Sequence, residues 1–333
     1  MIDGSTLLTG ATGFVGSAVA RTLLARGHAV RALVRAGGDR RNLDGLALEL
    51  AEGDLRDPAS LARAVAGCRY LVHVAADYRI WVPDPAAMEQ ANVAGTVSLL
   101  RAAKATGVER VVYCSSVAAL GLTKDGTPAV EDTPVREAAI AGLYKKSKYR
   151  AEQAVLRLVA DEGVPAVVVN PAGPVGPRDV KPTPTGRMIA DAANGRLPAY
   201  VDTGINVVHV DDVAEGHALA LEHGRVGERY ILGSENLHLR DILAMVAEVA
   251  GRKPPKIALD RRLLWPLALA SEGFARITGV EPLVTRDHLR MARKKMFFSS
   301  DKARAELGYA PRPARDAIVD AVAWFRHAGM VRG

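Results

Sequence analysis

A tyrosine and a lysine four residues apart, Tyr144 and Lys148, have the types and spacing that could move a proton. On a helix, residues four apart share one face, so the ammonium lies near the phenol. The positive charge favours the phenolate and lowers the tyrosine pKa, which makes the phenol a usable acid or base. Ser116 ends an apolar run earlier in the chain, and its hydroxyl could hold a substrate carbonyl. These residues predict proton transfer beside a hydride-carrying cofactor.

A glycine-rich turn near the start of the chain could hold that cofactor. It follows an apolar run and precedes an amphipathic helical pattern. Glycines there let the backbone approach a pyrophosphate and direct a helix N-terminus toward its charge. An ordinary strand-to-helix turn is the alternative, but the position favours a dinucleotide site. The residues of this turn are Gly10, Thr12, Gly13, Phe14, Val15 and Gly16.

The end of the second expected strand bears on the choice of cofactor. In NAD sites an acidic residue commonly holds the ribose 2′-hydroxyl at this point. Here the strand ends at Arg35, with Arg40 and Arg41 just beyond. A guanidinium suits a 2′-phosphate, so the sequence favours NADP. NAD remains possible if Arg35 is only a solvated charge at the strand end.

Two further strand ends could border the cofactor. Asp54 and Leu55 follow the third expected strand, where the carboxylate could lie near the adenine edge. Asp54 could equally be the N-cap of the helix that begins near Pro58. Ala75 and Ala76 end the fourth strand, and their small side chains would let the cofactor lie against the sheet edge.

The elements that must position these residues alternate between apolar runs and helical patterns. This alternation is typical of an α/β fold, a doubly wound parallel sheet of the Rossmann type. In such a sheet the carboxyl ends of the strands face one crevice, where Ser116, Tyr144 and Lys148 could converge. The expected strands span residues 5–8, 29–34, 48–51, 70–74, 110–115 and 166–170. The expected helices span residues 14–25, 58–66, 86–106 and 142–161.

A second, smaller domain is expected after residue 170, where prolines and glycines cluster and forbid regular structure. A strand at 207–210 and a helix at 213–222 suggest that the chain then returns to the first domain. We therefore assign 1–170 plus about 206–232 to a cofactor domain. The remaining 171–205 plus about 233–333 form a discontinuous substrate domain.

Charge and composition exclude several classes of function. The formal net charge is +7, but the basic residues are spread along the chain without interleaved aromatic residues, which argues against nucleic-acid binding. Cys68 and Cys114 lie in apolar segments without metal-ligand spacing, so we expect reduced thiols, no metal and a cytoplasmic location. No signal peptide or membrane span is expected. The mixed basic and apolar segment 261–277 fits a lid or core helix better than an interfacial helix.

Taken together, the motifs resemble those of the extended short-chain dehydrogenases/reductases, also called the NAD-dependent epimerase/dehydratase family. The resemblance covers nearly the whole chain, including a late segment at 300–309. The motifs that carry it are Thr9 to Gly16, Gly53 to Leu55, His73 to Ala76, Asn92 to Thr96, Ser115 and Ser116, Tyr144 to Lys148, Asn170 and Pro171, and His209 to Ala214.

This resemblance implies roles for individual residues. Counting back from Gly121 identifies Ser116, rather than Ser115, as the catalytic serine. Asn92 would steady the central helix beside the active site. The resemblance also implies a homodimer through the helices at 86–106 and 142–161. The residues that would border the nicotinamide are Pro171, Ala172 and Val175.

Within the family, the chain is most similar to dihydroflavonol-reductase-like proteins and to hopanoid-associated sugar epimerases. Sugar-nucleotide epimerases usually carry an arginine that grips the substrate pyrophosphate where this chain has Ile205. The departure argues against a nucleotide sugar, unless an arginine from another loop, Arg178, Arg187 or Arg196, supplies the charge. The expected substrate-contacting residues are Tyr78, Trp81, Met188, Tyr200 and His209.

Three functions therefore remain open. The first is an NADPH-dependent ketone or aldehyde reductase acting on a small molecule. The second is an epimerase or dehydratase acting on a sugar or lipid-linked intermediate, with a retained cofactor and no net turnover. The third is a non-catalytic dinucleotide-binding scaffold, which the complete serine, tyrosine and lysine set disfavours.

Overall fold

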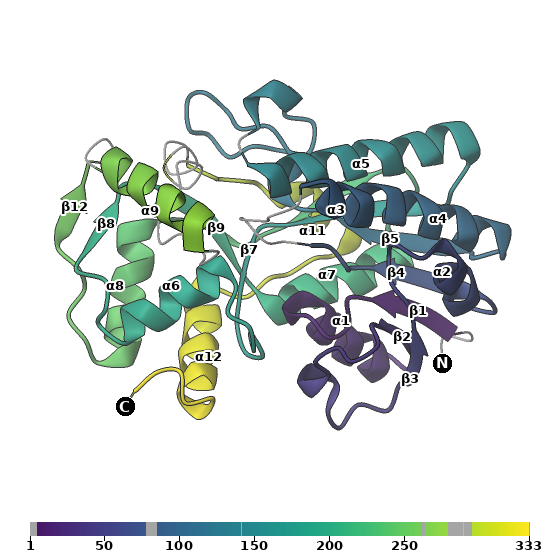
Figure 1. The fold of residues 1–333 in the computed structure, drawn as a ribbon, viewed down its shortest axis with the longest axis horizontal. Helices are drawn as coiled ribbons and strands as arrows, with labels where there is room; N and C mark the ends of the chain where they lie inside the picture. Colours follow the sequence, from purple (N-terminus) through teal and green to yellow (C-terminus); the bar gives the residue numbers. More distant parts are fainter. Residues whose placement is uncertain are drawn as a thin grey trace.

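A parallel sheet of seven strands forms the centre of the molecule in a computed structural model, which describes residues 5–77, 85–140, 142–260, 264–278, 289 and 295–332 (Figure 1). The strand order is β10-β6-β5-β4-β1-β2-β3, and every neighbouring pair is parallel. The order reverses between β1 and β4, which opens a crevice at the carboxyl ends of these strands. The strands are β1 (Ser5–Thr9), β2 (Ala29–Val34), β3 (Glu49–Glu52), β4 (Tyr70–His73), β5 (Arg110–Cys114), β6 (Ala166–Pro171) and β10 (Arg229–Leu232).

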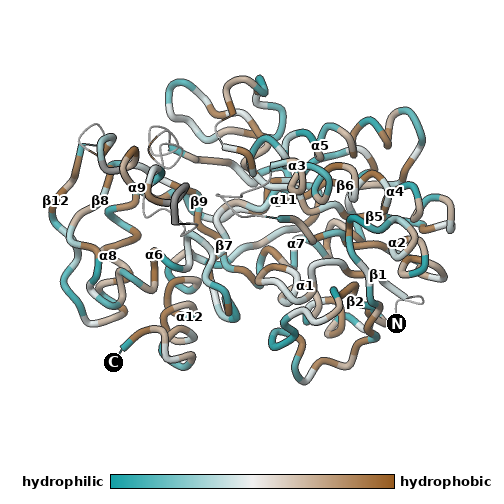
Figure 2. The backbone as a smooth tube through the Cα atoms, in the orientation of Figure 1, coloured by the Kyte–Doolittle hydropathy of each residue, from teal (hydrophilic) through white to brown (hydrophobic). Residues whose placement is uncertain are grey.

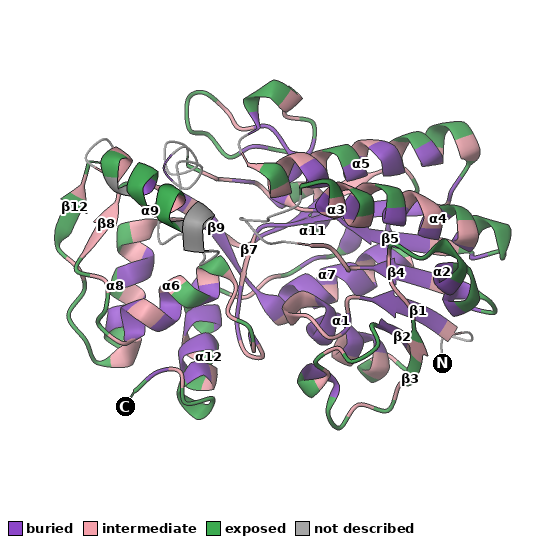
Figure 3. Ribbon diagram, viewed as in Figure 1, coloured by how far each residue is buried: buried purple, intermediate pink, exposed green. Residues whose placement is uncertain are grey.

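Helices cover both faces of this sheet, which confirms the doubly wound fold. Successive strand residues point to opposite faces, so the neighbours Leu7 and Leu8 belong to different hydrophobic clusters. The cluster of Leu8 includes helices α1 (Phe14–Ala25) and α7 (Val210–His223). That of Leu7 includes α2 (Pro58–Val65), α4 (Gly95–Ala105) and α5 (Leu143–Glu162). Figure 3 shows the central strands buried and the outer helix faces exposed.

The helix expected at 86–106 is present but contains a π-helical turn. It consists of α3 (Pro85–Glu89), a π-helical turn η2 (Gln90–Ala94) and then α4. A π turn inserts an extra residue into a helix and often lies at a functional site. Here it carries Asn92, which is buried against α5. Among the described residues, short 3-10 turns include η1 (Arg41–Leu43), η3 (Val117–Ala119) and η4 (Glu137–Ala139).

A smaller layer of strands and helices packs beside the sheet (Figure 1). Its core includes Ile189, Val246, Ile318 and Phe325, and Figure 2 shows hydrophobic and hydrophilic residues alternating along its helices. Its strands are β7 (Gly173–Val175), β9 (Gly204–His209) and β11 (Glu235–His238) in one sheet, with β8 (Ala199–Val201) and β12 (Ile257–Leu259) in another. Its helices are α6 (Pro184–Ala193), α8 (Leu239–Ala250), α9 (Trp265–Thr278) and α12 (Ala314–His327).

The strand expected at 207–210 differs in its partners from our expectation. It is β9, and it pairs with β7 and β11 rather than with the main sheet. The chain rejoins the main layers through α7 and β10, which pairs with β6. Helix α11 (Asp301–Leu307) then packs on α7. The division into two domains at the stated boundaries stays a prediction.

Several expectations from composition can be compared with the described residues. Cys68 and Cys114 are buried and unpaired. In the part of the chain that the structure describes, no group of acidic, histidine and cysteine side chains is arranged to bind a metal. Over those same residues, no helix combines the length and apolar character that crossing a membrane requires. Helix α9 exposes Leu269 and Phe274, and its role as a lid stays a prediction.

Candidate active site

The glycine-rich turn connects β1 to α1 and leaves no room for side chains. Gly10 has φ +75°, and a Cβ at this position would lie 2.7 Å from the backbone nitrogen of Ala75. A Cβ at Gly16 would overlap the carbonyl oxygen of Gly10. Gly13 is the N-cap of α1, so no side chain caps the first amides of this helix. This bare, tightly folded cradle fits the pyrophosphate of a dinucleotide.

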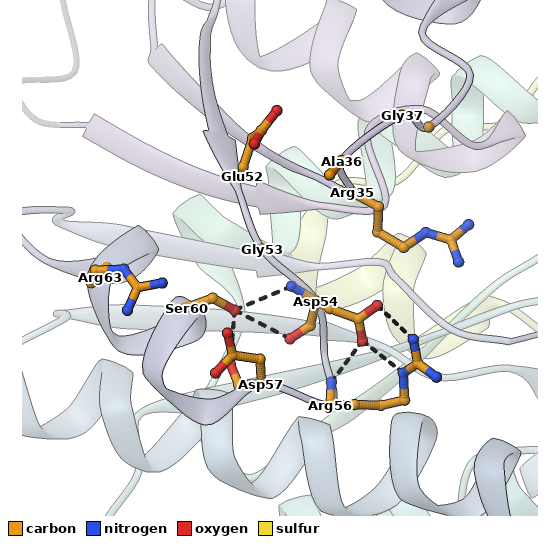
Figure 4. A pocket seen from close by; sticks show the side chains of 11 residues that line it. Arg35, Ala36, Gly37, Glu52, Gly53, Asp54, Arg56, Asp57, Ser60 and Arg63 are labelled. Atoms are coloured by element: carbon orange, nitrogen blue, oxygen red, sulfur yellow. Dashed lines mark hydrogen bonds and ion pairs between the residues drawn. The ribbon is translucent and has the colours of Figure 1, made fainter.

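The ends of β2 and β3 frame a hollow of about 610 Å³ next to this turn (Figure 4). Arg40 pairs with Glu52 at 3.2 Å, and Arg41 pairs with Asp39 at 2.7 Å. The Arg35 guanidinium, by contrast, makes no hydrogen bond or ion pair with any other residue that the structure describes. Of the three arginines considered from sequence, Arg35 alone therefore offers an unpaired guanidinium to an anion.

Asp54 lines the same hollow but is not the helix cap. The N-cap of α2 is Asp57, whose carboxylate accepts the Ala59 amide at 3.1 Å. The Asp54 carboxylate instead accepts hydrogen bonds from Arg56, which hold the pKa of Asp54 below its usual value. In Figure 4 the Arg35 and Arg56 guanidinium groups lie on the same side of the hollow, and Arg63 lies on the other. Leu55 packs against α4, where a Cβ on Gly95 would lie 2.5 Å from the Leu55 carbonyl oxygen.

A buried chain of hydrogen bonds connects the glycine-rich turn to the central helix. The Thr9 hydroxyl lies 2.7 Å from Nδ1 of His73 and accepts the Ala75 amide at 3.1 Å. On the other side of the ring, Nε2 lies 2.9 Å from the Thr96 hydroxyl, which donates to the Asn92 carbonyl oxygen. Burial lowers the pKa of His73 to about 3, so the ring is neutral at physiological pH. These hydrogen bonds fix the end of β4, which is followed by Ala75 and Ala76.

Asn92 joins this strand end to the helix that carries Tyr144. Its side-chain oxygen accepts the Asp77 amide at 2.7 Å, and its Nδ2 donates to the Asp77 carbonyl at 2.9 Å. The same Nδ2 lies 3.0 Å from the Ser147 hydroxyl, which donates to the Tyr144 carbonyl at 2.8 Å. Asn92 therefore braces the first turn of α5, in agreement with the role that the resemblance implies.

The structure brings Ser116, Tyr144 and Lys148 together at the carboxyl end of β5. Ser116 lies two residues after the end of β5, and the interaction of its hydroxyl with the Tyr144 phenol opposes the rise in the phenol's pKa. The Ser116 Oγ also accepts the Ala118 amide at 3.1 Å and so caps η3. The Lys148 ammonium is buried and donates to the Cys114 carbonyl oxygen at 2.7 Å.

The electrostatics of this group differ from the sequence-based expectation. We expected Lys148 to lower the tyrosine pKa, but burial raises the pKa of Tyr144 to about 12, opposed by the Ser116 hydrogen bond. Burial also lowers the pKa of Lys148. The physical reason is that the ammonium donates to a backbone carbonyl and lies over the Tyr113 ring, 5.0 Å from its centroid. At neutral pH the phenol is therefore protonated and can donate a proton.

The expected substrate and nicotinamide residues lie in varied surroundings. Tyr78 and Trp81 fall outside the described residues. His209 is fully buried: its Nδ1 accepts the Asp211 amide at 3.0 Å and its Nε2 lies 3.0 Å from Asp320, so both ring nitrogens are engaged. Residues that pack partly exposed against the core of the smaller layer are Met188, Tyr200 and Ile205. Residues buried at or just after the end of β6 are Pro171, Ala172 and Val175.

The structure also describes the three arginines that could supply the positive charge missing at Ile205. Arg178, with φ +75°, forms an ion pair with Asp211, and Arg196 pairs with Asp191 at 3.3 Å. Arg187 lies on the exposed side of α6. Arg178 and Arg196 are thus paired with carboxylates in their own neighbourhood.

A comparison with protein families decides where this arrangement belongs. The model of the NAD dependent epimerase/dehydratase family matches residues 6–233, which include the glycine-rich turn and Ser116, Tyr144 and Lys148. The chain belongs to this family. Family members are NAD(P)-dependent oxidoreductases, reductases, epimerases and dehydratases, so the protein is an enzyme of this type.

Similar members of the epimerase/dehydratase family include both reductases and epimerases. A Synechocystis protein with the provisional name dihydroflavonol 4-reductase is 42% identical over 98% of this chain and 95% of its own length. Sterol demethylase protein B of Methylococcus capsulatus is 38% identical over 98% of this chain and 100% of its own length. The solved structure of gox2253 is 62% identical in sequence and has a TM-score of 0.89; the match covers 98% of this chain and 99% of gox2253. The solved structure of a nucleoside-diphosphate-sugar epimerase from Pseudomonas aeruginosa is 26% identical in sequence and has a TM-score of 0.81; the match covers 99% of this chain and 100% of the epimerase.

Sequence reasoning overlooked two parts of this epimerase/dehydratase site. The motifs did not predict the series of hydrogen bonds that joins Thr9, His73 and Thr96, although all three residues lie in or next to these motifs. The motifs also did not include Glu152, a fully buried acid that lies four residues after Lys148. The i+4 spacing on the catalytic helix was a usable signal for Glu152, because it places the carboxylate on the same face as Tyr144 and Lys148.

Proposed function

We propose that the protein is an NADPH-dependent reductase of a ketone or aldehyde. The observation that carries the proposal is the protonated phenol of Tyr144, held by Ser116 at the crevice beside the glycine cradle. A group with a pKa of about 12 is poised to give a proton to a developing alkoxide, which is a strong base. Such a donor serves carbonyl reduction directly.

Each residue of the set has a distinct role in this reaction. NADPH, when bound, would supply the hydride for the carbonyl carbon. Ser116 donates a hydrogen bond to the carbonyl oxygen and orients it toward Tyr144. Tyr144 transfers its phenolic proton to that oxygen, which leaves an alcohol and a phenolate. Lys148 anchors α5 to the end of β5 and would hold the nicotinamide ribose, and the phenolate then takes a proton from solvent.

NADP is the preferred cofactor in this proposal, and Arg35 is its main support. The guanidinium is exposed and unpaired among the described residues, while Arg40 and Arg41 are neutralised by carboxylates. A free guanidinium at the end of β2 suits a 2′-phosphate. The phosphate would lie beside Arg35 and Arg56 in the hollow of Figure 4. The residues that would border the nicotinamide remain Pro171, Ala172 and Val175.

A sugar epimerase is the second candidate, because of the structural similarity to the nucleoside-diphosphate-sugar epimerase of P. aeruginosa. The same Tyr144 would then take a proton from a hydroxyl and later return it. Ile205 argues against a nucleotide sugar, since it packs on the apolar core of the smaller layer. The names of the Synechocystis and Methylococcus relatives point instead to flavonoid and sterol compounds.

The deciding experiment strips the purified protein of cofactor and titrates it with NADPH and NADH. A panel of a dihydroflavonol, a sterol ketone, simple aldehydes and nucleotide sugars is then read for NADPH loss and product stereochemistry. Stoichiometric NADPH loss with a carbonyl compound supports the reductase. A changed sugar stereocentre without net cofactor loss would establish the epimerase. Tyr144→Phe that abolishes either activity without weakening cofactor binding would reject the scaffold hypothesis.

The substrate wall and the oligomeric state complete the proposal. Met188 and Tyr200 are partly exposed on the smaller layer and would contact the substrate. We also propose a homodimer formed through α4 and α5. Val93, Val97 and Leu156 remain partly exposed in this region, and association would cover them. A monomeric mass at micromolar concentration would reject the dimer.

A further inference from the structure

Glu152 is a fully buried carboxylate on the catalytic helix, and no step of the proposed reaction uses it. It follows Tyr144 by eight residues and Lys148 by four, so the three side chains share one face of α5. A buried charge is retained only where partners compensate for its lost hydration. The partners of Glu152 therefore indicate what it does.

Two groups hold the Glu152 carboxylate. Asn170 Nδ2, at the end of β6, lies 2.6 Å from Oε2. Arg229 Nη1, on the edge strand β10, lies 3.4 Å from Oε1. The Arg229 guanidinium also pairs with the exposed Asp132 at 2.9 Å. The amide of Asn170 is thus the nearer partner of the buried carboxylate.

The second hydrogen of the same amide reaches the active site. Asn170 Nδ2 also donates to the main-chain carbonyl oxygen of Ser116 at 3.1 Å. Asn170 Oδ1 is buried and has no hydrogen-bond partner among the described residues. A reversed amide would turn this oxygen toward a carboxylate and a carbonyl, both of which only accept. The carboxylate therefore fixes the amide in the one orientation that can hold Ser116.

We propose that Glu152 and Asn170 are positioning residues: Glu152 orients the Asn170 amide, which holds the Ser116 backbone and thereby sets the Ser116 hydroxyl against Tyr144. The proposal rests on the proposed function only for the identity of the reaction. Proton transfer at Tyr144 is common to the reductase and to the epimerase. Misplacement of a reacting group by about 1 Å can cost on the order of 100-fold in rate.

The first test compares four variants in the reaction that the wild type catalyses. Asn170→Asp removes both N–H donors at nearly constant volume, and Glu152→Ala removes the orienting carboxylate. We expect both to lower kcat by about 10- to 100-fold, with the cofactor Kd within about twofold of wild type. Glu152→Gln still accepts from Asn170 and should retain kcat within about threefold. The matched control is Glu162→Gln, which breaks an ion pair with Arg101 at the outer end of the same helix and should leave kcat unchanged.

A double-mutant cycle then tests whether Asn170 acts through Ser116. If it does, Asn170→Asp in a Ser116→Ala background should cost less than about threefold, because the positioned hydroxyl is already absent. Independent, multiplicative losses would overturn the proposal. An unchanged kcat in a folded Asn170→Asp protein would overturn it as well.

A measurement without turnover separates this proposal from the proposed function. The NMR signal of the ¹³Cζ-labelled Tyr144 phenol, assigned with Tyr144→Phe, reports the hydrogen bond from Ser116. The chemical shift of this signal should change in Asn170→Asp and in Glu152→Ala, and it should stay unchanged in Glu162→Gln. A wild type that reduces no carbonyl compound would refute the reductase but leave this result intact. An unmoved signal in both positioning variants would refute the proposal whatever the reaction.

Discussion

The ammonium of Lys148 lies 2.7 Å from the main-chain carbonyl oxygen of Cys114, at the end of the strand that leads to Ser116. The lysine is therefore anchored to the sheet rather than to the phenol of Tyr144. This anchoring ties α5 to β5 at the point where the catalytic side chains meet. It also leaves Tyr144 with a raised pKa and Lys148 with a lowered one.

The pH dependence of carbonyl reduction should follow from these two groups. Tyr144 must be protonated to donate and Lys148 must be charged to hold the nicotinamide ribose, so both requirements fail as the pH rises. We expect kcat/KM for reduction to be level from about pH 6 to 8 and to fall at higher pH, and alcohol oxidation to increase instead. Initial rates in both directions would check this. A reduction rate that rises with pH would contradict the assigned role of Tyr144.

Replacing Arg35 should change cofactor choice. Loss of the unpaired guanidinium in Arg35→Ser removes charge-assisted hydrogen bonds to a 2′-phosphate. We expect the NADPH Kd to rise by about 10- to 100-fold, with little effect on the NADH Kd. Fluorescence titration of both cofactors measures the two constants. Arg41→Ser is the matched control, because Arg41 is already paired with Asp39 and should matter little. Equal weakening of NADPH and NADH would show that Arg35 does not read the phosphate.

Gly10→Ala should damage the cofactor cradle beyond the effect of backbone strain. Gly10 and Gly27 both have positive φ, +75° and +84°, so alanine is strained by about 1–3 kcal/mol at either position. Only at Gly10 would the new Cβ meet backbone, 2.7 Å from the Ala75 nitrogen, whereas Gly27 has open space. Gly10→Ala should therefore lose cofactor binding and Gly27→Ala should keep it. Calorimetric titration and thermal unfolding of both variants separate the two effects.

His73 should make stability depend on pH. Burial lowers its pKa in the folded protein to about 3, below the ordinary value of 6.5. Between these values the unfolded chain binds more protons, so the contribution of His73 to stability is present above about pH 6.5 and is lost as the pH falls toward 3. His73→Gln should flatten this part of the dependence, measured as the free energy of unfolding in urea at several pH values. An unchanged slope would mean that the ring is not buried in its neutral form.

His73→Phe tests the hydrogen bonds of the same residue. The substitution would leave the buried hydroxyls of Thr9 and Thr96 without their ring partners. Each hydroxyl keeps one other hydrogen bond, to the Ala75 amide or the Asn92 carbonyl, so we expect a loss of about 1–3 kcal/mol in the free energy of unfolding, because each lost bond contributes about 0.5–1.5 kcal/mol. Urea unfolding at neutral pH measures it. A loss below 1 kcal/mol would show that the hydroxyls find other partners.

Local sequence patterns determined the doubly wound fold and the positions of its main elements. Strand residues such as Leu7 and Leu8 are apolar on both faces, which only a sheet covered by helices can bury. The glycine spacing specified the cradle, because Gly10 and Gly16 exclude side chains for reasons of local geometry. The four-residue spacing of Tyr144 and Lys148 likewise placed both on one helix face.

Tertiary structure decided which polar groups are paired. Arg35 and Arg40 look alike in sequence, but only Arg40 finds a carboxylate, that of Glu52 on β3. His209 seemed available to substrate, yet Asp320, more than a hundred residues later, holds its ring. The link from Glu152 through Asn170 to Ser116 joins three separate elements. Such pairings depend on distances between segments far apart in the chain, and no local periodicity encodes them.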